Sequence, residues 1–67
     1  MEKKLMELLE EKRQTINEDK ATVMFNEHSI DVIGIDEEGY EGIGEKYYSV
    51  YDAYDRLEFL GALEEGN

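Results

Sequence analysis

The chain contains no cysteine in its 67 residues, so its fold must hold together without disulfides or thiolate-bound metals. A domain of this length lies near the lower limit at which an apolar core alone is sufficient. Seven aromatic residues, the absence of proline and regularly spaced apolar residues favour an ordered chain over a disordered one. We therefore expect residues 1–67 to form one small domain of modest stability.

Charge is the second strong constraint. The chain has 18 Asp or Glu residues against 7 Lys or Arg, which gives a formal net charge of −11. Residues 21–67 hold twelve acids and two bases, whereas residues 1–20 are nearly balanced. Direct binding to DNA, RNA or anionic lipid is disfavoured, because their phosphates would repel this charge. A membrane span needs about 20 apolar residues, and no such run or secretory signal is present, so we expect a cytoplasmic protein.

Helical periodicity is visible near both ends of the sequence. The spacing of apolar residues predicts a first helix from residue 2 to about residue 15, with Ile16 in its apolar stripe and Asn17 as its stop. Ser49 is a typical helix-capping residue. It predicts a second helix from residue 50 to residue 60 or 63.

Strand-forming residues dominate the middle of the chain. They predict three strands at 22–26, 30–36 and 40–47, with glycines that weaken or bulge the third. Gly39 suits a hairpin turn that needs a positive φ. The sequence therefore predicts an α+β domain of order helix–three-stranded antiparallel sheet–helix (αβββα), with both helices on one face of the sheet.

The sequence offers little catalytic chemistry. His28 is the only histidine, and neighbouring residues on a strand point to opposite faces, so Ser29 would not pair with it. The four carboxylates between residues 36 and 41 lack the ligand spacing of a calcium loop. The glycines of this region are flanked by acids that would repel a phosphate. We expect no enzyme activity, no cofactor and no dedicated metal site.

The second helix carries the first candidate binding surface. A helical wheel places Asp52, Asp55, Glu58 and Phe59 on its outer face. Like charges at this spacing weaken a helix, so local stability does not explain them. Carboxylates beside an aromatic ring are well suited to bind Lys and Arg. We interpret these four residues as partner contacts; the alternative is that Phe59 packs against the first helix and the acids are only solvated.

The predicted hairpin supplies further carboxylates. Its tip and third strand contribute Asp36, Glu37, Glu38, Glu41 and Glu45. Alternate residues on a strand lie about 6.6 Å apart, and neighbouring carboxylates on a helix about 5–6 Å apart. A rigid array of this kind imitates the charge of a nucleic-acid backbone. Its natural target is a positively charged groove that holds DNA or RNA.

The leading hypothesis is a small acidic inhibitor, encoded by a phage or mobile element and acting in the host cytoplasm. It would occupy the basic groove of a nucleic-acid-binding protein such as a CRISPR effector, nuclease or repair enzyme. In size, charge and lack of catalytic motifs the chain is similar in kind to phage-encoded DNA mimics, which include uracil-DNA glycosylase inhibitors, anti-restriction proteins and anti-CRISPR proteins. No residue motif carries this likeness.

Two alternatives remain open at this point. One is an interaction module that binds through an open sheet face or through the tyrosines, which are Tyr40, Tyr47, Tyr48, Tyr51 and Tyr54. The other is an antitoxin-like neutraliser of a basic toxin, which shares the electrostatics and differs only in its partner. The sequence selects neither a monomer nor a dimer.

Overall fold

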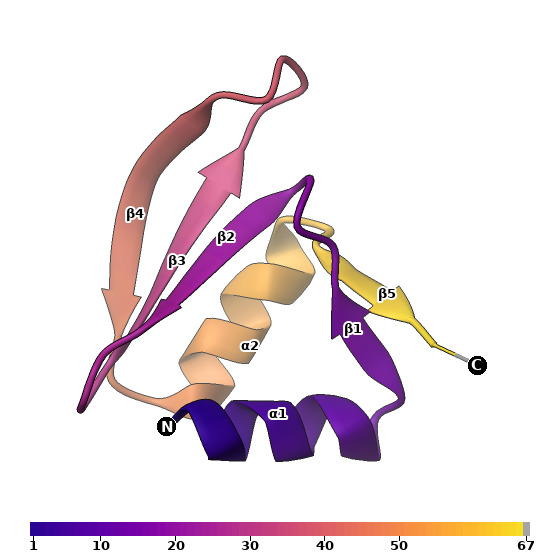
Figure 1. Ribbon diagram of the computed structural model, residues 1–67, viewed down its shortest axis with the longest axis vertical. Coiled ribbons are helices and arrows are strands. Elements are labelled where there is room, and N and C mark those ends of the chain that lie inside the picture. Colours follow the sequence, from indigo (N-terminus) through magenta and orange to yellow (C-terminus); the bar gives the residue numbers. More distant parts are fainter. Residues whose placement is uncertain (67) are drawn as a thin grey trace.

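The computed structural model describes residues 1–66 and has the predicted α+β class. Its elements, in chain order, are α1 (Glu2–Glu11), β1 (Gln14–Ile16), β2 (Ala21–Phe25), β3 (Ile30–Ile35), β4 (Glu41–Tyr47), α2 (Val50–Phe59) and β5 (Leu63–Glu65). The strands form a three-stranded antiparallel sheet, β2-β3-β4, and a two-stranded antiparallel sheet, β1-β5 (Figure 1). The two helices and the three-stranded sheet are confirmed, and the small sheet is an addition.

The first helix is shorter than the sequence predicts. α1 ends at Glu11, and Arg13 takes a left-handed φ of 55°. The chain then enters β1, so Ile16 belongs to a strand and Asn17 is not the helix stop. The reason is a distant partner: β1 pairs with β5, with Gln14 opposite Glu65. Helical periodicity cannot reveal such a partner.

The second helix begins where expected and ends early. The Ser49 hydroxyl accepts a hydrogen bond from the Tyr51 N–H and caps α2. Gly61 has a φ of 68°, which suits the residue that follows a helix end. Leu63, one of the two predicted helix ends, therefore starts β5. Ala62, which follows the helix end, is fully buried.

The three-stranded sheet is a meander of two hairpins. Gly39 supplies the predicted positive φ, 89°, in the turn between β3 and β4. A register shift between Ile33 and Ile35 interrupts the pairing of these strands. A Cβ atom at Gly44 would lie 2.9 Å from Cγ1 of Ile33, so β4 needs glycine at this close approach.

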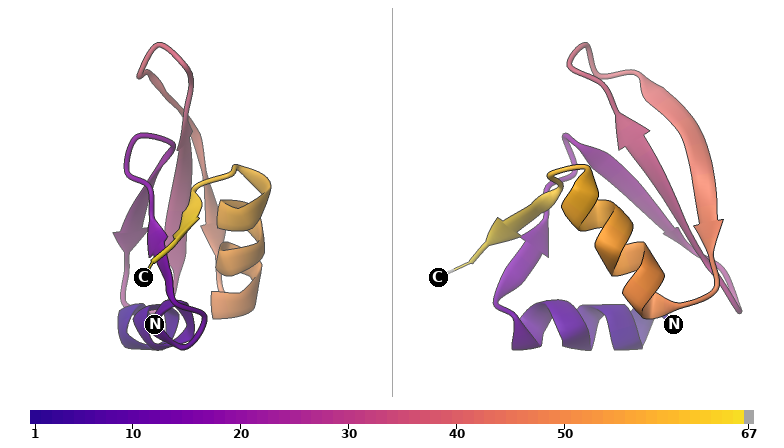
Figure 2. Two further views of the ribbon diagram at one scale, coloured as in Figure 1. Left: turned by 90° about the vertical axis from the view of Figure 1, so that its right-hand side faces the viewer. Right: turned by 180° about the vertical axis from the view of Figure 1, so that it is seen from behind.

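The core lies between the three-stranded sheet, α2 and the inner side of α1. Its largest fully buried side chains are Leu5, Ile30, Val32 and Leu57. α2 covers one face of the sheet and packs on β3 and β4, whereas α1 packs on α2 and β1 (Figure 2). The prediction that both helices cover one sheet face is thus correct only for α2. The domain is flat, with Cα extents of 31 × 30 × 15 Å.

Candidate partner-binding surface

The outer face of α2 places its four predicted residues in solvent. Asp52, Asp55 and Glu58 are exposed, and none has a hydrogen bond or ion pair through its carboxylate within residues 1–66. The Phe59 side chain is 77% exposed. Its ring faces the Arg56 guanidinium, 5.1 Å from the ring centroid. The alternative that Phe59 packs against the first helix is therefore wrong.

The hairpin between β3 and β4 presents the next group of carboxylates. Glu37, Glu38 and Glu41 are exposed, and their carboxylates are unpartnered within the described chain. Asp36 differs, because its Oδ1 accepts the N–H groups of Glu38 and Tyr40 at 2.9 Å each. Asp36 therefore shapes the turn in addition to carrying charge.

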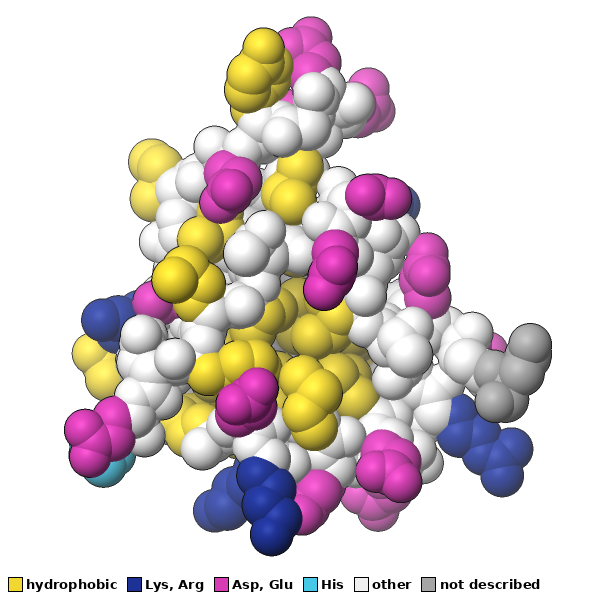
Figure 3. Space-filling model, viewed as in Figure 1, with side chains coloured by type: hydrophobic (Ala, Val, Ile, Leu, Met, Phe, Trp, Pro, Cys, Tyr) yellow, Lys and Arg dark blue, Asp and Glu magenta, His cyan; other side chains and the backbone are white. Residues whose placement is uncertain are grey.

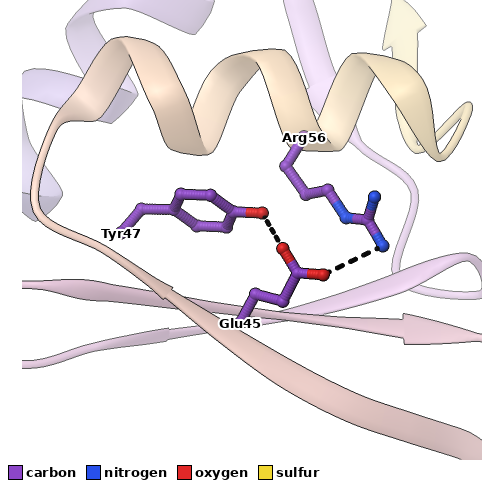
Figure 4. Close-up of polar contacts among 3 residues, drawn as sticks. All are labelled: Glu45, Tyr47 and Arg56. Carbon is purple, nitrogen blue, oxygen red and sulfur yellow. Dashed lines mark hydrogen bonds and ion pairs between the residues drawn. The ribbon is translucent and has the colours of Figure 1, made fainter.

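Glu45 links the strand side of the surface to the helix. Its carboxylate accepts the hydroxyl of Tyr47 and pairs with Arg56 of α2, with an Oε1 to Nη2 distance of 3.5 Å (Figure 4). The hydrogen bond to Glu45, followed by burial, raises the pKa of Tyr47 above its ordinary value. Ionised Tyr47 would lose this hydrogen bond and place its negative charge against the carboxylate. The ion pair with Arg56 links β4 to α2.

The three groups lie on α2, on β4, which contacts α2, and on the hairpin that leads into β4. All eight predicted carboxylates are exposed, and they come from α2, β4 and the hairpin that leads into β4. Within residues 21–66 the only lysine or arginine residues are Lys46 and Arg56, and Arg56 is already paired with Glu45. Lys12 of α1 lines a hollow together with Asp55 and so offsets part of this charge. The remaining carboxylates attract cationic groups.

Exposed apolar side chains lie among these acids. Ile43 is 95% exposed and sits on β4 between Glu41 and Glu45. Tyr48 and Tyr51 are also mostly exposed. Apolar anchors within a charged rim are typical of protein–protein interfaces. Ile43 is not among the predicted contacts, although its place between two acids and two glycines is a sequence signal for an exposed apolar residue in an acidic strand.

Residues 1–66 contain no group of three or more His, Cys, Asp or Glu side chains placed to hold a metal ion. His28 is exposed and lies 3.5 Å from Glu27. Ser29 is buried, and its hydroxyl accepts a hydrogen bond from the Asn26 amide. Over the same residues, neither helix has the length and apolar character that crossing a bilayer requires.

Comparison with known proteins adds no identification, because no family model, curated protein or solved structure matches the chain. The class that the structure defines is a small α+β domain with an acidic surface in which apolar side chains are interspersed.

Proposed function

We propose that this protein is a non-enzymatic inhibitor that binds the basic groove of a nucleic-acid-binding enzyme and excludes the nucleic acid. The observation that carries the proposal is the set of eight exposed carboxylates with Arg56 as the paired cation among them. Six of these carboxylates have no hydrogen-bond or ion-pair partner within residues 1–66. Their charge is therefore available to lysine and arginine side chains of a partner.

The arrangement of the carboxylates supports a groove as the target. They are held on a helix, a strand and a tight turn, and neighbouring members are spaced by about 5–7 Å. Such a surface can follow cationic side chains that normally contact successive phosphates. Ile43 and Phe59 are exposed and can act as apolar anchors. Such anchors add binding energy to the electrostatic attraction. Suitable targets are a CRISPR effector, a nuclease or a repair enzyme. The protein would be encoded by a phage or mobile element and would bind its target in the cytoplasm of the host cell.

An interaction module is the second candidate, and the exposed rings favour it. Tyr48, Tyr51 and Phe59 are each at least 70% exposed. A partner that binds chiefly through these side chains needs no nucleic-acid groove. Its complex would tolerate salt, because apolar contacts are not screened.

The decisive experiment measures inhibition with purified enzymes. A panel of nucleases, glycosylases and CRISPR effectors is assayed for cleavage or excision at increasing concentrations of the protein, at low and at high salt. An inhibited enzyme should regain activity when excess DNA or RNA is added, because both ligands compete for one groove. Inhibition should weaken steeply as salt rises, because charge pairing is screened.

Variants with the same charge change locate the surface. The site variant replaces Asp52, Asp55 and Glu58 by Lys. The control variant replaces the exposed residues Glu2, Glu10 and Glu18 by Lys; Glu10 and Glu18 lie on the side of α1 that adjoins β1. The site variant should lose on the order of 100-fold in affinity, and the control much less. Equal losses would show that only net charge matters. Binding that resists salt and does not compete with nucleic acid would contradict the inhibitor proposal and favour the interaction module.

A further inference from the structure

Strand β4 forms an outer edge of the three-stranded sheet, because only β3 pairs with it (Figure 1). All of its residues from Glu41 to Lys46 are exposed. Within residues 1–66 no segment other than β3 makes a backbone hydrogen bond to β4. An edge strand of this kind presents unpaired N–H and C=O groups, to which a further strand can be added.

The hydrogen-bond pattern of the sheet identifies the unpaired groups. On the β2 side, Ile35 donates its N–H to the carbonyl of the residue just before β2. Successive residues of an antiparallel strand turn their backbone groups to opposite sides, so Val32 turns its N–H and C=O toward β4, where Glu45 is its partner. Gly44 and Lys46, on either side of Glu45, therefore direct their N–H and C=O groups outward from the sheet.

Two glycines leave this edge open to a second backbone. Gly42 and Gly44 lie within β4 and have no side chain to obstruct an approaching strand. The opposite edge of the sheet is less available. Ala21 of β2 is fully buried, and its N–H already donates to the carbonyl of Asn17. Strand addition is therefore best supported at β4.

The charges beside this edge favour a basic occupant. Glu45 contacts Arg56, so it lies on the sheet face that α2 covers. The pKa of Tyr47 is raised by Glu45 and by burial and, more weakly, by the charge of Asp52, which places Asp52 on the same side of α2. Asp52, Arg56 and Phe59 are spaced four and three residues apart and share one line of the helix. Figure 3 shows further acidic side chains on the hairpin that leads into β4.

A strand added to β4 would place every second side chain on the face that carries Glu45 and Asp52. Lysine or arginine suits these positions, because each cation can pair with a carboxylate, and an arginine can also stack on the Phe59 ring. A second copy of β4 is a poorer occupant, since it would bring its own acids and a net charge of −11 to the same edge.

We propose that β4 binds an extended basic segment of its partner by antiparallel strand addition. Gly44 and Lys46 supply the backbone hydrogen bonds, and Lys or Arg at alternate positions of the added segment reaches Glu45 and Asp52. The antiparallel direction continues that of β2-β3-β4 and is the slightly more stable pairing. The proposal rests on the proposed function for the basic character of the partner, and it adds backbone pairing as the mode of contact.

Nuclear magnetic resonance with the acetylated peptide Lys-Val-Lys-Thr-Lys-Val-Lys tests the site. Its lysines share one face of an extended strand. Binding should slow hydrogen exchange at the Gly44 and Lys46 amides, whereas the Glu45 and Tyr47 amides, which face β3, should change little. A peptide that does not bind, or exchange that stays unchanged at Gly44 and Lys46 in the saturated complex, would overturn the proposal.

Two methylated forms of the peptide separate backbone pairing from charge attraction. One form carries N-methyl groups on its valines and threonine, whose N–H groups face β4 in the antiparallel arrangement when the lysines lie on the α2 face. The other form carries the same number of N-methyl groups on lysines, so the charges of the two are equal. The first should bind at least about 10-fold more weakly than the second. Equal binding, or the reverse order, would overturn the proposal.

A proline on the edge tests the same pairing from the side of the protein. Lys46→Pro removes an outward N–H and leaves the bonds to β3 in place. Lys46→Ala is the matched control, because it loses the same charge. The proline variant should bind the peptide at least about 10-fold more weakly than the alanine variant, and equal binding would contradict strand addition. Circular dichroism checks folding, and the methylated peptides decide the question if Lys46→Pro does not fold.

The enzyme panel distinguishes a failure of this proposal from a failure of the inhibitor function. Peptide pairing at β4 with no enzyme inhibited would overturn the inhibitor function and support the edge site. Inhibition that nucleic acid competes away, equal for Lys46→Pro and Lys46→Ala, would support the inhibitor function and overturn strand addition.

Discussion

Tyr47, Glu45 and Arg56 show that the acidic surface also has a structural role. Glu45 binds a hydroxyl from its own strand and a guanidinium from α2. Because Arg56 also faces the Phe59 ring, the same cation touches two predicted partner-contact residues. Arg56 therefore restrains both side chains.

The Tyr47 contact predicts a pH-dependent stability difference. Tyr47→Phe should lower the free energy of unfolding at neutral pH by about 1 kcal/mol, the usual net value of a hydrogen bond. The contact raises the folded-state pKa of Tyr47, so this stabilisation is complete below pH about 10, the unfolded-state pKa. It is lost as pH rises through the folded-state pKa. Urea unfolding of both proteins from pH 7 upward measures the difference.

Tyr48→Phe is the control for this prediction. The Tyr48 side chain is 74% exposed and its hydroxyl makes no hydrogen bond within residues 1–66. Its removal should change stability little at any pH. A Tyr47→Phe deficit that stays constant into strongly alkaline solution would contradict the assigned role of the hydroxyl.

Among the secondary-structure elements, α2 depends most clearly on one local contact. Ser49→Ala removes the side chain that accepts the Tyr51 N–H. The free energy of unfolding should fall by about 1 kcal/mol. Ser49→Asp should retain most of it, because a carboxylate also caps and interacts favourably with the helix dipole. Chemical denaturation of the three proteins gives both differences, and equal stability of all three would show that the cap is unimportant.

Elements specified by neighbours in sequence were predictable, and elements specified by distant partners were not. Gly39 and Ser49 define a turn and a helix start through local backbone chemistry, so the hairpin and α2 follow from the sequence. β1 and β5 are three residues each and exist because they pair with each other. The local sequence of neither segment predicts that it pairs with the other.

The same division applies to the candidate surface. The exposure of Asp52, Asp55 and Phe59 follows from helical periodicity, because the opposite stripe of α2 is apolar. The engagement of Glu45 by Arg56 could not be predicted, because it depends on how α2 lies against β4. A hollow lined by Met6 and Leu9 of α1 and by Ile16 of β1 was also unpredictable, because it forms only after α1 has ended early.

At the scale of the whole molecule, a net charge of −11 opposes the compact state. Added salt should therefore stabilise the fold, and the thermal midpoint should rise by several degrees between about 20 mM and 500 mM NaCl. Replacing Asp52, Asp55 and Glu58 by Lys should reduce this salt response, because it removes much of the repulsion. Calorimetry at matched pH measures both, and an unchanged or falling midpoint would contradict the self-repulsion argument.

The pairing of β1 with β5 has a consequence for the order in which the chain is assembled on the ribosome. Gln14 and Ile16 are synthesised early, yet their partners Glu65 and Leu63 leave the exit tunnel about fifty residues later. The β2-β3-β4 meander needs only neighbouring segments and can form first. We therefore expect the β2-β3-β4 sheet to form first and the β1-β5 pair to form last. A stalled chain that ends before residue 63 would leave its first strand without a partner.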